Sequence, residues 1–344
     1  MSKNPKLKKL QKESKKFQKY ISTQDFSALF YQFEKGYQLS TNEYKKKFTT
    51  GLLQQNSIKN RYRNVLPIEK TRVKLQIENE KSDYINANFL SDPLIDSNKK
   101  LYVLSQCPLN KSFDDFWRMV WDQECNLVIN LTVLIEKGRK KCDQYWPKAD
   151  STSATKYGEF KLTNYSTNEI SEITTSEGIT IRQFKLEKIE NEKENEQEQE
   201  IENEKEKEKE KEKEKEKEKK KKKFKSRIIT QIHFTAWPDF GVPDETQYIE
   251  LIDLVSRFSQ NSNPPIVHCS AGIGRTGVFV LIDVTLRRIK YWLENKTKWK
   301  ISRAFNLMKT LAELRSYRHG LVQTPKQLKF CFFVVHFFTQ QLLK

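Results

Sequence analysis

One stretch of the sequence, "PPIVHCSAGIGRTGVFVLIDV" from Pro264 to Val284, limits the fold more than any other. Ile266 and Val267 are β-branched and follow two prolines, which favours a short buried strand. From Thr276 onward the apolar residues recur at the spacing of a helix. Residues 268–275 are therefore predicted to form a tight loop that joins the end of a strand directly to the start of a helix.

The composition of this loop favours an anion-binding site with a nucleophile at its base. Gly272 and Gly274 allow the loop to curl, so that successive backbone N–H groups point to one centre at a helix N-terminus. Arg275 adds a planar set of donors that suits phosphate oxygens. Cys269, beside this centre, is expected to be ionised and therefore nucleophilic. The alternative is a buried, inert Cys269 with Arg275 on the surface.

The net charge of the chain is strongly positive and unevenly distributed. The 344 residues carry a formal charge of +18, of which residues 187–223 contribute −2 and the rest of the chain +20. A basic surface attracts polyanions such as nucleic acid, anionic lipid or acidic phosphopeptides, although solubility alone would also account for it. The chain contains no recognised nucleic-acid motif, so we expect no nucleic-acid partner.

The N-terminus and the cysteines bear on location. Residues 1–25 are basic without the apolar core of a secretory signal, and no segment has the ~18 apolar residues that a transmembrane span needs. Four apolar residues there are spaced for a weakly amphipathic helix that docks on the domain or on a partner: Leu7, Leu10, Phe17 and Ile21. The five cysteines are odd in number, scattered and without the spacing of a metal site, which predicts free thiols in a reducing compartment. We therefore expect a cytoplasmic protein, with the nucleus as the alternative.

A run of alternating glutamate and lysine separates two strand-like segments, 178–186 and 226–234. Within residues 187–223 only Ile189 and Ile201 are apolar, so this low-complexity insert cannot join a core. Strict alternation places like charges at i and i+4, which opposes a stable helix. We predict a mostly disordered, transiently helical insert, coiled-coil-like in composition, on a β-hairpin. A role in interactions and a neutral insertion are both open.

The segment "VHCSAGIGRTG" resembles the Cys-x5-Arg active-site signature of the protein tyrosine phosphatases. Six further stretches resemble motifs of that family and occur in its order: "KNRYRNVLP", "DYINANF", "FWRMVWDQ", "EKGRKKCDQYWP", "TAWPDFGVP" and "LRSYRHGLVQTPKQL". The resemblance implies an α/β fold with a twisted, mixed central sheet flanked by helices. It also implies a catalytic domain over residues 26–344, interrupted by the insert 187–223 and preceded by a basic lead-in of residues 1–25.

The resemblance implies cysteine-dependent hydrolysis of phosphotyrosine in proteins, with no metal and no other cofactor. Cys269 would attack phosphorus and form a cysteinyl-phosphate. The phosphate oxygens would be bound by Arg275 and by the loop residues Ser270, Ala271, Gly272, Ile273 and Gly274. Asp239 would be the general acid, on a loop bounded by Trp237 and Gly241 that can close as a lid. An aspartate after proline is, by itself, more typical of a turn.

The same resemblance implies further residues that bind substrate or support the site. Gln323 and Gln327 would orient the attacking water, although two glutamines near a helix start are by themselves typical of solvated positions. Tyr62 would form an aromatic wall for the substrate ring. Asn64 stands where some members have an aspartate that grips the peptide backbone, so the charge is lost there. The implied supporting residues, each of which could instead be an ordinary core or surface residue, are His268, Thr276, Trp237, Glu136, Lys141 and Tyr145.

Specific supporting roles also follow from the resemblance. His268 would help to hold Cys269 as thiolate, and Tyr145 would bond His268. Glu136 would orient Arg275, while Lys141 would reach the Asp239 loop.

Two other functions compete with an active tyrosine phosphatase. A catalytically dead phosphotyrosine-binding module would require the loss of Cys269, Arg275 or Asp239, and all three are present. A phosphoinositide phosphatase would be expected to have lysines within the Cys-x5-Arg loop, which this chain lacks. The expected partners are phosphotyrosine-containing proteins, and the basic surface favours acidic ones. The sequence departs from the family pattern at Cys107, where glycine is usual, and at Ile68-Glu69, where an aromatic residue and aspartate are common.

Overall fold

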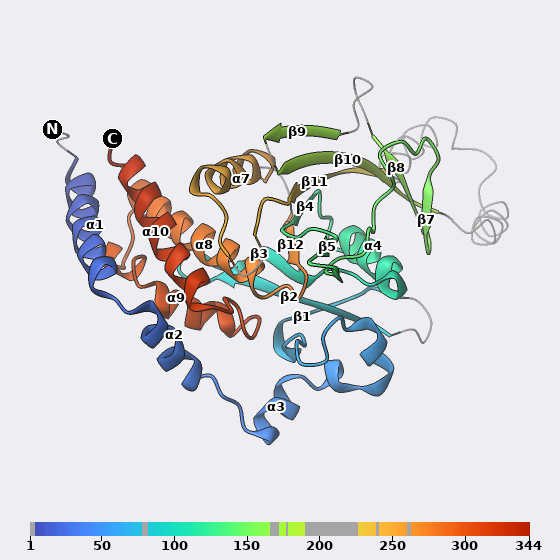
Figure 1. Cartoon of the computed structure of the whole chain (residues 1–344), viewed down its shortest axis with the longest axis horizontal. Coiled ribbons are helices and arrows are strands. Elements are labelled where there is room, and N and C mark those ends of the chain that lie inside the picture. Colours follow the sequence, from blue (N-terminus) through green and yellow to red (C-terminus); the bar gives the residue numbers. More distant parts are fainter. Residues whose placement is uncertain are drawn as a thin grey trace, which may run out of the picture.

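A mixed β-sheet forms the centre of the molecule, and helices cover both of its faces (Figure 1). The computed structural model describes residues 4–77, 82–165, 172–176, 178–189, 226–238, 241–259 and 263–344. The strand order of the sheet is β1-β2-β3-β12-β4-β11-β10-β8-β7, and β9 pairs with β10. The strands are β1 Arg72–Lys74, β2 Tyr84–Asp92, β3 Asp96–Gln106, β4 Leu127–Asn130, β7 Thr155–Tyr157, β8 Phe160–Asn164, β9 Glu172–Ser176, β10 Ile179–Lys188, β11 Ser226–Phe234 and β12 Ile266–Cys269. A separate two-stranded ribbon consists of β5 Ile135–Glu136 and β6 Arg139–Lys140.

The strand predicted before Cys269 is β12, and it lies in the middle of the sheet. It pairs in parallel with β3 on one side and with β4 on the other, and all of its residues are buried. Because side chains alternate along a strand, Ile266 and Val267 pack into different apolar clusters on the two faces. Burial on both faces explains why this strand is an unbroken apolar run up to His268.

The helices divide between the two faces of the sheet. The apolar cluster around Val267 includes residues of α1, α2, α7, α8, α9 and α10, whereas the cluster around Ile266 includes residues of α4. The helices are α1 Pro5–Thr23, α2 Phe26–Lys35, α3 Thr41–Lys47, α4 Phe113–Asp122, α7 Glu245–Phe258, α8 Arg275–Glu294, α9 Leu307–Arg315 and α10 Pro325–Gln341. α8 begins directly after the loop, so the predicted strand–loop–helix unit and the predicted α/β fold are both confirmed.

The basic N-terminal segment forms a long helix, α1, that packs along α10 (Figure 1). Leu10, Phe17 and Ile21 are buried in the apolar cluster around Val267, which also contains residues of α8 and α10. Ser14 accepts a hydrogen bond from the Gln340 amide at 2.9 Å. The boundary expected at residue 25 remains a prediction, but α1 shares its core with the rest of the chain.

The two strand-like segments that flank the Glu/Lys run pair as a hairpin. β10 and β11 are antiparallel, with Leu186 opposite Arg227 and Glu187 opposite Ser226. β10 thus extends to Lys188, slightly into the segment taken as insert. The insert beyond residue 189 lies outside the described residues. Among the helices that the structure describes, none has the length and apolar character that crossing a bilayer requires.

Candidate active site

The carbonyl groups of the loop after β12 accept hydrogen bonds from the rest of the protein. Arg318, a fully buried side chain, donates to the carbonyl oxygens of Ala271 and Gly272 at 3.0 and 2.8 Å. The Ser270 carbonyl accepts from the Cys107 N–H at 3.1 Å. Within the described part of the chain, the N–H groups of residues 271–274 donate to no backbone acceptor. Successive unpaired amides at the start of a helix are an anion-binding arrangement.

Gly272 is required by the closeness of this loop to β3. Its φ is +72°, in the left-handed region, and a Cβ at this position would lie 2.0 Å from the Ser105 carbonyl oxygen. Any side chain would push the loop away from the strand. The glycine predicted to let the loop curl therefore also allows it to sit directly on the neighbouring strand.

Arg318 is a functional residue that the sequence reasoning did not single out. Besides the two loop carbonyls, its guanidinium donates to the side-chain oxygens of Asn86 and Asn88, both at 2.9 Å. Burial lowers the pKa of Arg318 to about 10, so it remains a cation at neutral pH. The available signal was Asn86 and Asn88, two amides at alternate positions among the apolar residues 85–90, which require buried partners.

Arg275 is held from the ribbon β5–β6 and from the end of β4. Its guanidinium donates to Glu136 at 2.5 Å and to the Thr132 hydroxyl at 3.2 Å. Lys141 Nζ lies 3.8 Å from the other Glu136 oxygen. A guanidinium fixed by a carboxylate keeps one orientation, which is what binding phosphate through two oxygens requires. The structure thus brings together Glu136 and Arg275, the pair implied by the family resemblance.

A chain of hydrogen bonds runs from Gln231 to the nucleophile position. The Gln231 amide donates to the Tyr145 hydroxyl at 3.0 Å, so this hydroxyl gives its own proton to His268 Nε2, 2.6 Å away. His268 Nδ1 then carries the ring proton and faces the Cys269 carbonyl at 3.3 Å. Burial lowers the pKa of His268 to about 3, so the imidazole is neutral. The contact of His268 with the Cys269 carbonyl is therefore made by an uncharged ring.

Two buried neutral histidines predict acid sensitivity. Burial lowers the pKa of His268 to about 3 and that of His233 to about 4, against 6.5 for a free histidine. Below pH 6.5 the unfolded chain binds protons that the folded chain does not. The free energy of unfolding should therefore fall as pH drops from about 6.5 toward 4, by up to about 1.4 kcal/mol per pH unit for each histidine. Urea denaturation at pH 7 and pH 5 measures it. His233→Gln should reduce the slope, and an unchanged stability across this range would contradict the neutral assignment.

The cleft around Cys269 has a volume of about 460 Å³, and most of the expected substrate residues line it. The Tyr62 hydroxyl lies 2.8 Å from Ser270 Oγ, which donates in turn to the Lys141 carbonyl at 2.6 Å. Gln327 Oε1 accepts from the Gln323 N–H at 2.8 Å, which links the two glutamines. The expected residues that line the cleft are Tyr62, Asn64, Glu136, Lys141, Trp237, Cys269, Ser270, Ala271, Gly274, Arg275, Gln323 and Gln327.

The remaining expected site residues lie elsewhere. Gly272, Ile273, Thr276, His268 and Tyr145 do not line the cleft, and the last four are buried. The Thr276 hydroxyl is buried and has no hydrogen-bond partner among the described residues. Asp239 lies outside the described residues. Trp237 is buried, and its indole N–H donates to the Gly241 carbonyl at 3.2 Å, so the described residues on either side of Asp239 are bonded to each other.

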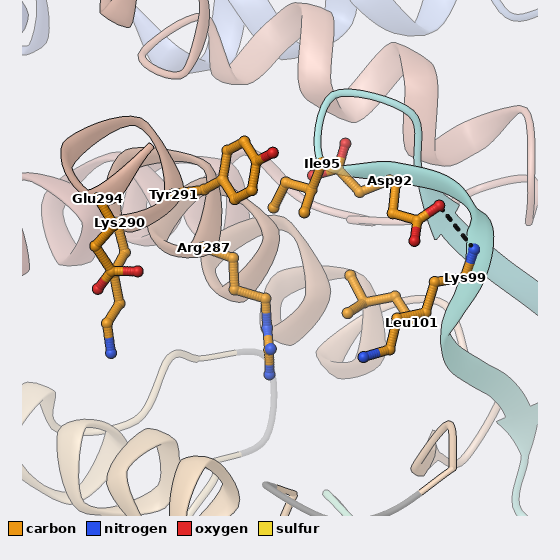
Figure 2. Close-up of a pocket in the computed structure, with 9 residues that line it drawn as sticks. Asp92, Ile95, Lys99, Leu101, Arg287, Lys290, Tyr291 and Glu294 are labelled. Atoms are coloured by element: carbon orange, nitrogen blue, oxygen red, sulfur yellow. Dashed lines mark hydrogen bonds between the residues drawn. The ribbon is translucent and has the colours of Figure 1, made fainter. Parts of the chain in front are cut away.

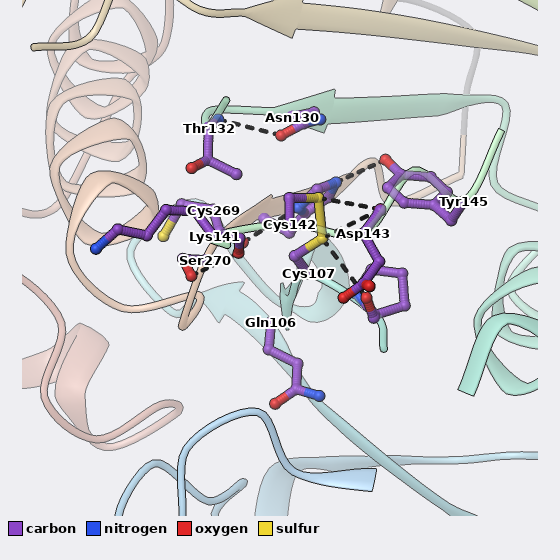
Figure 3. The surroundings of a disulfide bond; sticks show 12 residues. Gln106, Cys107, Asn130, Thr132, Lys141, Cys142, Asp143, Tyr145, Cys269 and Ser270 are labelled. Atoms are coloured by element: carbon purple, nitrogen blue, oxygen red, sulfur yellow. Dashed lines mark hydrogen bonds between the residues drawn. A yellow bond between two sulfur atoms is a disulfide. The ribbon is translucent and has the colours of Figure 1, made fainter. Parts of the chain in front are cut away.

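The expectation that all five cysteines are free thiols is wrong. Cys107 and Cys142 form a disulfide, whereas Cys125, Cys269 and Cys331 are free (Figure 3). The two partners are 35 residues apart, with no local spacing that would mark a pair, and only the fold brings their Cα atoms to 5.5 Å. Cys107 is the residue that departs from the family's glycine. Both sulfurs lie within 4.8 Å of a His268 ring nitrogen.

The disulfide joins two segments that support the nucleophile loop. Cys107 follows β3 and its N–H binds the Ser270 carbonyl, whereas Cys142 follows Lys141, whose carbonyl binds the Ser270 hydroxyl. Reduction is expected to lower the free energy of unfolding by about 4 kcal/mol, because the cross-link closes a loop of 35 residues. Guanidinium denaturation with and without dithiothreitol measures this. A Cys107→Ser/Cys142→Ser variant should not respond to the reductant, and equal stability of the wild type in both conditions would exclude the disulfide in solution.

The profile of the family described as protein-tyrosine phosphatase matches residues 56–202 and 190–336. The chain belongs to this family. It is 34% identical over 283 residues to human receptor-type tyrosine-protein phosphatase eta, a match that covers 81% of this chain and 17% of the relative. Human tyrosine-protein phosphatase non-receptor type 2 is 32% identical over 285 residues, covering 82% and 56% of the two chains. Tyrosine-protein phosphatase 3 of Dictyostelium discoideum is 32% identical over 299 residues, covering 85% and 26%. The chain thus spans less than two thirds of the length of each of these relatives.

Proposed function

We propose that this phosphatase-family chain hydrolyses phosphotyrosine in proteins through a cysteinyl-phosphate intermediate. The observation that carries the proposal is the loop of residues 270–274. Its carbonyls are bonded to the protein, and its amides are left for an anion between Cys269 and the Glu136-bound Arg275. Tyr62 lines the cleft that contains this loop, and its aromatic ring can pack against the ring of an aryl phosphate.

The two half-reactions can be assigned to residues of this chain. In the first, the Cys269 thiolate attacks phosphorus as the bond from phosphorus to the tyrosine oxygen breaks, and Asp239 gives its proton to the leaving phenolate. Arg275 and the loop amides stabilise the charge on the equatorial oxygens. In the second, Gln323 and Gln327 orient a water molecule, Asp239 takes its proton, and the oxygen attacks phosphorus. Phosphate leaves and the Cys269 thiolate is restored.

The activity is tested by comparing one peptide in two phosphorylated forms, and by comparing both with a phosphoinositide. The purified chain should release phosphate from the phosphotyrosine peptide at least about 100-fold faster, in kcat/KM, than from its phosphoserine counterpart. The shorter phosphoserine cannot place its phosphorus at Cys269 while its backbone stays outside the cleft. Hydrolysis of a phosphoinositide at a higher kcat/KM than the phosphotyrosine peptide would favour the phosphoinositide phosphatase. Tight phosphopeptide binding without turnover would favour the binding module.

A cytoplasmic location and a signalling role belong to the same proposal. Support comes from the chemistry of Cys269, which must be a reduced thiol to act. The Cys107–Cys142 pair is oxidised, so the cysteines as a set do not favour a reducing compartment.

A further inference from the structure

A lysine-rich groove lies between α1 and the segment after α8, and neither the fold nor the proposed activity explains its positive charge. The groove has a volume of about 660 Å³. Seven of its lining residues are lysines and one is an acid: Lys6, Lys9, Lys12, Lys16, Lys296, Lys298, Lys300 and Glu13. We call these residues the basic groove. Trp292 and Trp299 also line it.

Another pocket on the same side of the sheet is a useful contrast. Figure 2 shows it beside the C-terminal half of α8. Its lining includes the cations Lys99, Arg287 and Lys290 and the acids Asp92, Asp96 and Glu294. Cations and acids are equal in number there, so the pocket has no net attraction for a polyanion. The excess of lysine in the basic groove is therefore a property of that surface, and not of every hollow in a basic protein.

Two lysines of the groove have a hydrogen-bonded partner among the described residues: Lys16 pairs with Glu13 at 2.8 Å, and Lys6 holds two helices together. Lys6 Nζ donates to the carbonyl oxygens of Trp292, Leu293 and Asn295 at 2.9, 3.0 and 2.8 Å, and so ties α1 to the C-terminal end of α8. Lys9, Lys12, Lys296, Lys298 and Lys300 are exposed. Lysine charges that line one groove repel one another, and a bound anion would reduce that repulsion.

Exposed apolar side chains flank the same helix. Four of the large hydrophobic residues that the structure describes as exposed lie on α1, on α10 or just after α10: Tyr20, Phe333, Phe337 and Leu342. We call them the apolar ridge. Tyr20 stacks on Phe332, and Ser14 bonds Gln340, so α1 lies beside α10, the helix that carries Phe333 and Phe337 (Figure 1).

We propose that the α1 face, with the basic groove and the apolar ridge, docks the protein on an anionic lipid bilayer. Lysine ammonium groups on long flexible side chains suit a layer of phosphate and carboxylate head groups. Single phosphates of a nucleic acid are better bound by the planar guanidinium of arginine, and no arginine lines the groove. Nucleic acid would also leave the apolar ridge without a partner, whereas a bilayer offers its acyl boundary to Phe333, Phe337 and Leu342.

Such docking is compatible with the proposed chemistry. The groove contacts the C-terminal end of α8, and Arg275 is at the N-terminal end. The 20 residues of α8 separate the two by about 30 Å. The residues that would meet lipid are therefore different from the residues that line the Cys269 cleft.

Vesicle co-sedimentation tests the proposal with the full chain. Phosphatidylcholine vesicles with about 30 mol % phosphatidylserine should bind the protein at about 100 mM salt, and binding should weaken as salt is raised. Pure phosphatidylcholine vesicles should bind at least tenfold more weakly. A Lys9→Glu/Lys298→Glu variant, with one change on each wall of the groove, should lose at least about tenfold in affinity. Phe337→Ser should weaken binding about fivefold or more without changing its salt dependence.

A matched control reverses the same amount of charge elsewhere. Lys156 and Lys161 are exposed partners on β7 and β8, at the far end of the sheet from α1 (Figure 1). Lys156→Glu/Lys161→Glu should bind vesicles within about twofold of the wild type. All variants should retain wild-type turnover of a small aryl phosphate, which shows that they fold.

The proposal is overturned by any of three results. These are no binding to anionic vesicles at about 100 mM salt, an equal loss in the control variant, or tighter binding of a single-stranded RNA or a polyglutamate peptide than of the vesicles.

Discussion

Replacing Cys269 by serine is expected to reduce turnover of a phosphotyrosine peptide to below about one part in a hundred of the wild type. A serine hydroxyl is not ionised near neutral pH, so the attack on phosphorus loses its nucleophile. The anion site does not depend on the sulfur, because it is built from Arg275, the loop amides and Arg318. The variant should therefore fold and bind the phosphopeptide. Single-turnover kinetics and calorimetric titration measure the two properties separately.

Another buried cysteine provides the control. The Cys125 thiol donates to the Leu127 carbonyl at 3.0 Å, a bond that a serine hydroxyl can also make. Cys125→Ser should therefore keep wild-type turnover. If Cys269→Ser retains more than about one part in a hundred of the activity, or if Cys125→Ser loses as much, Cys269 is not the nucleophile.

The centre of the fold could be predicted from the sequence because local patterns and global structure agree there. The β-branched residues before Cys269 and the helical spacing after Thr276 are the observed β12 and α8. The hairpin β10–β11 was also predicted, since two strand-like segments flank the Glu/Lys run. Such consistency is what makes a pattern informative.

The parts that sequence reasoning missed depend on contacts between distant segments. Arg318 reaches the loop across 46 residues, and nothing near it in the sequence marks it as buried. Cys107 and Cys142 become partners only when β3 and the ribbon β5–β6 meet at the nucleophile loop. The basic groove likewise combines α1 with lysines nearly 300 residues away, such as Lys298. No periodicity could have indicated these pairings.

Replacing Asp239 by alanine is expected to lower kcat for a phosphotyrosine peptide by about 10²–10⁴, the usual contribution of a general acid. The phenol of tyrosine has a pKa of about 10, so its departure at neutral pH requires a proton. The Trp237–Gly241 hydrogen bond joins the described residues on either side of Asp239, and both of these residues line the cleft. With an aryl phosphate whose phenol is acidic enough to leave unprotonated, the loss should shrink to tenfold or less. Steady-state kinetics on both substrates measures the difference.

Glu136 is the control that makes this test specific, because it is the carboxylate among the described residues that line the cleft. It binds Arg275 at 2.5 Å, so Glu136→Gln should disturb phosphate binding whatever the leaving group. Its effect on kcat/KM should therefore be similar for the two substrates, whereas that of Asp239→Ala should depend on the leaving group. If the pattern is reversed, with Glu136→Gln sensitive to the leaving group and Asp239→Ala not, then Glu136 is the proton donor and Asp239 has only a structural role in its loop.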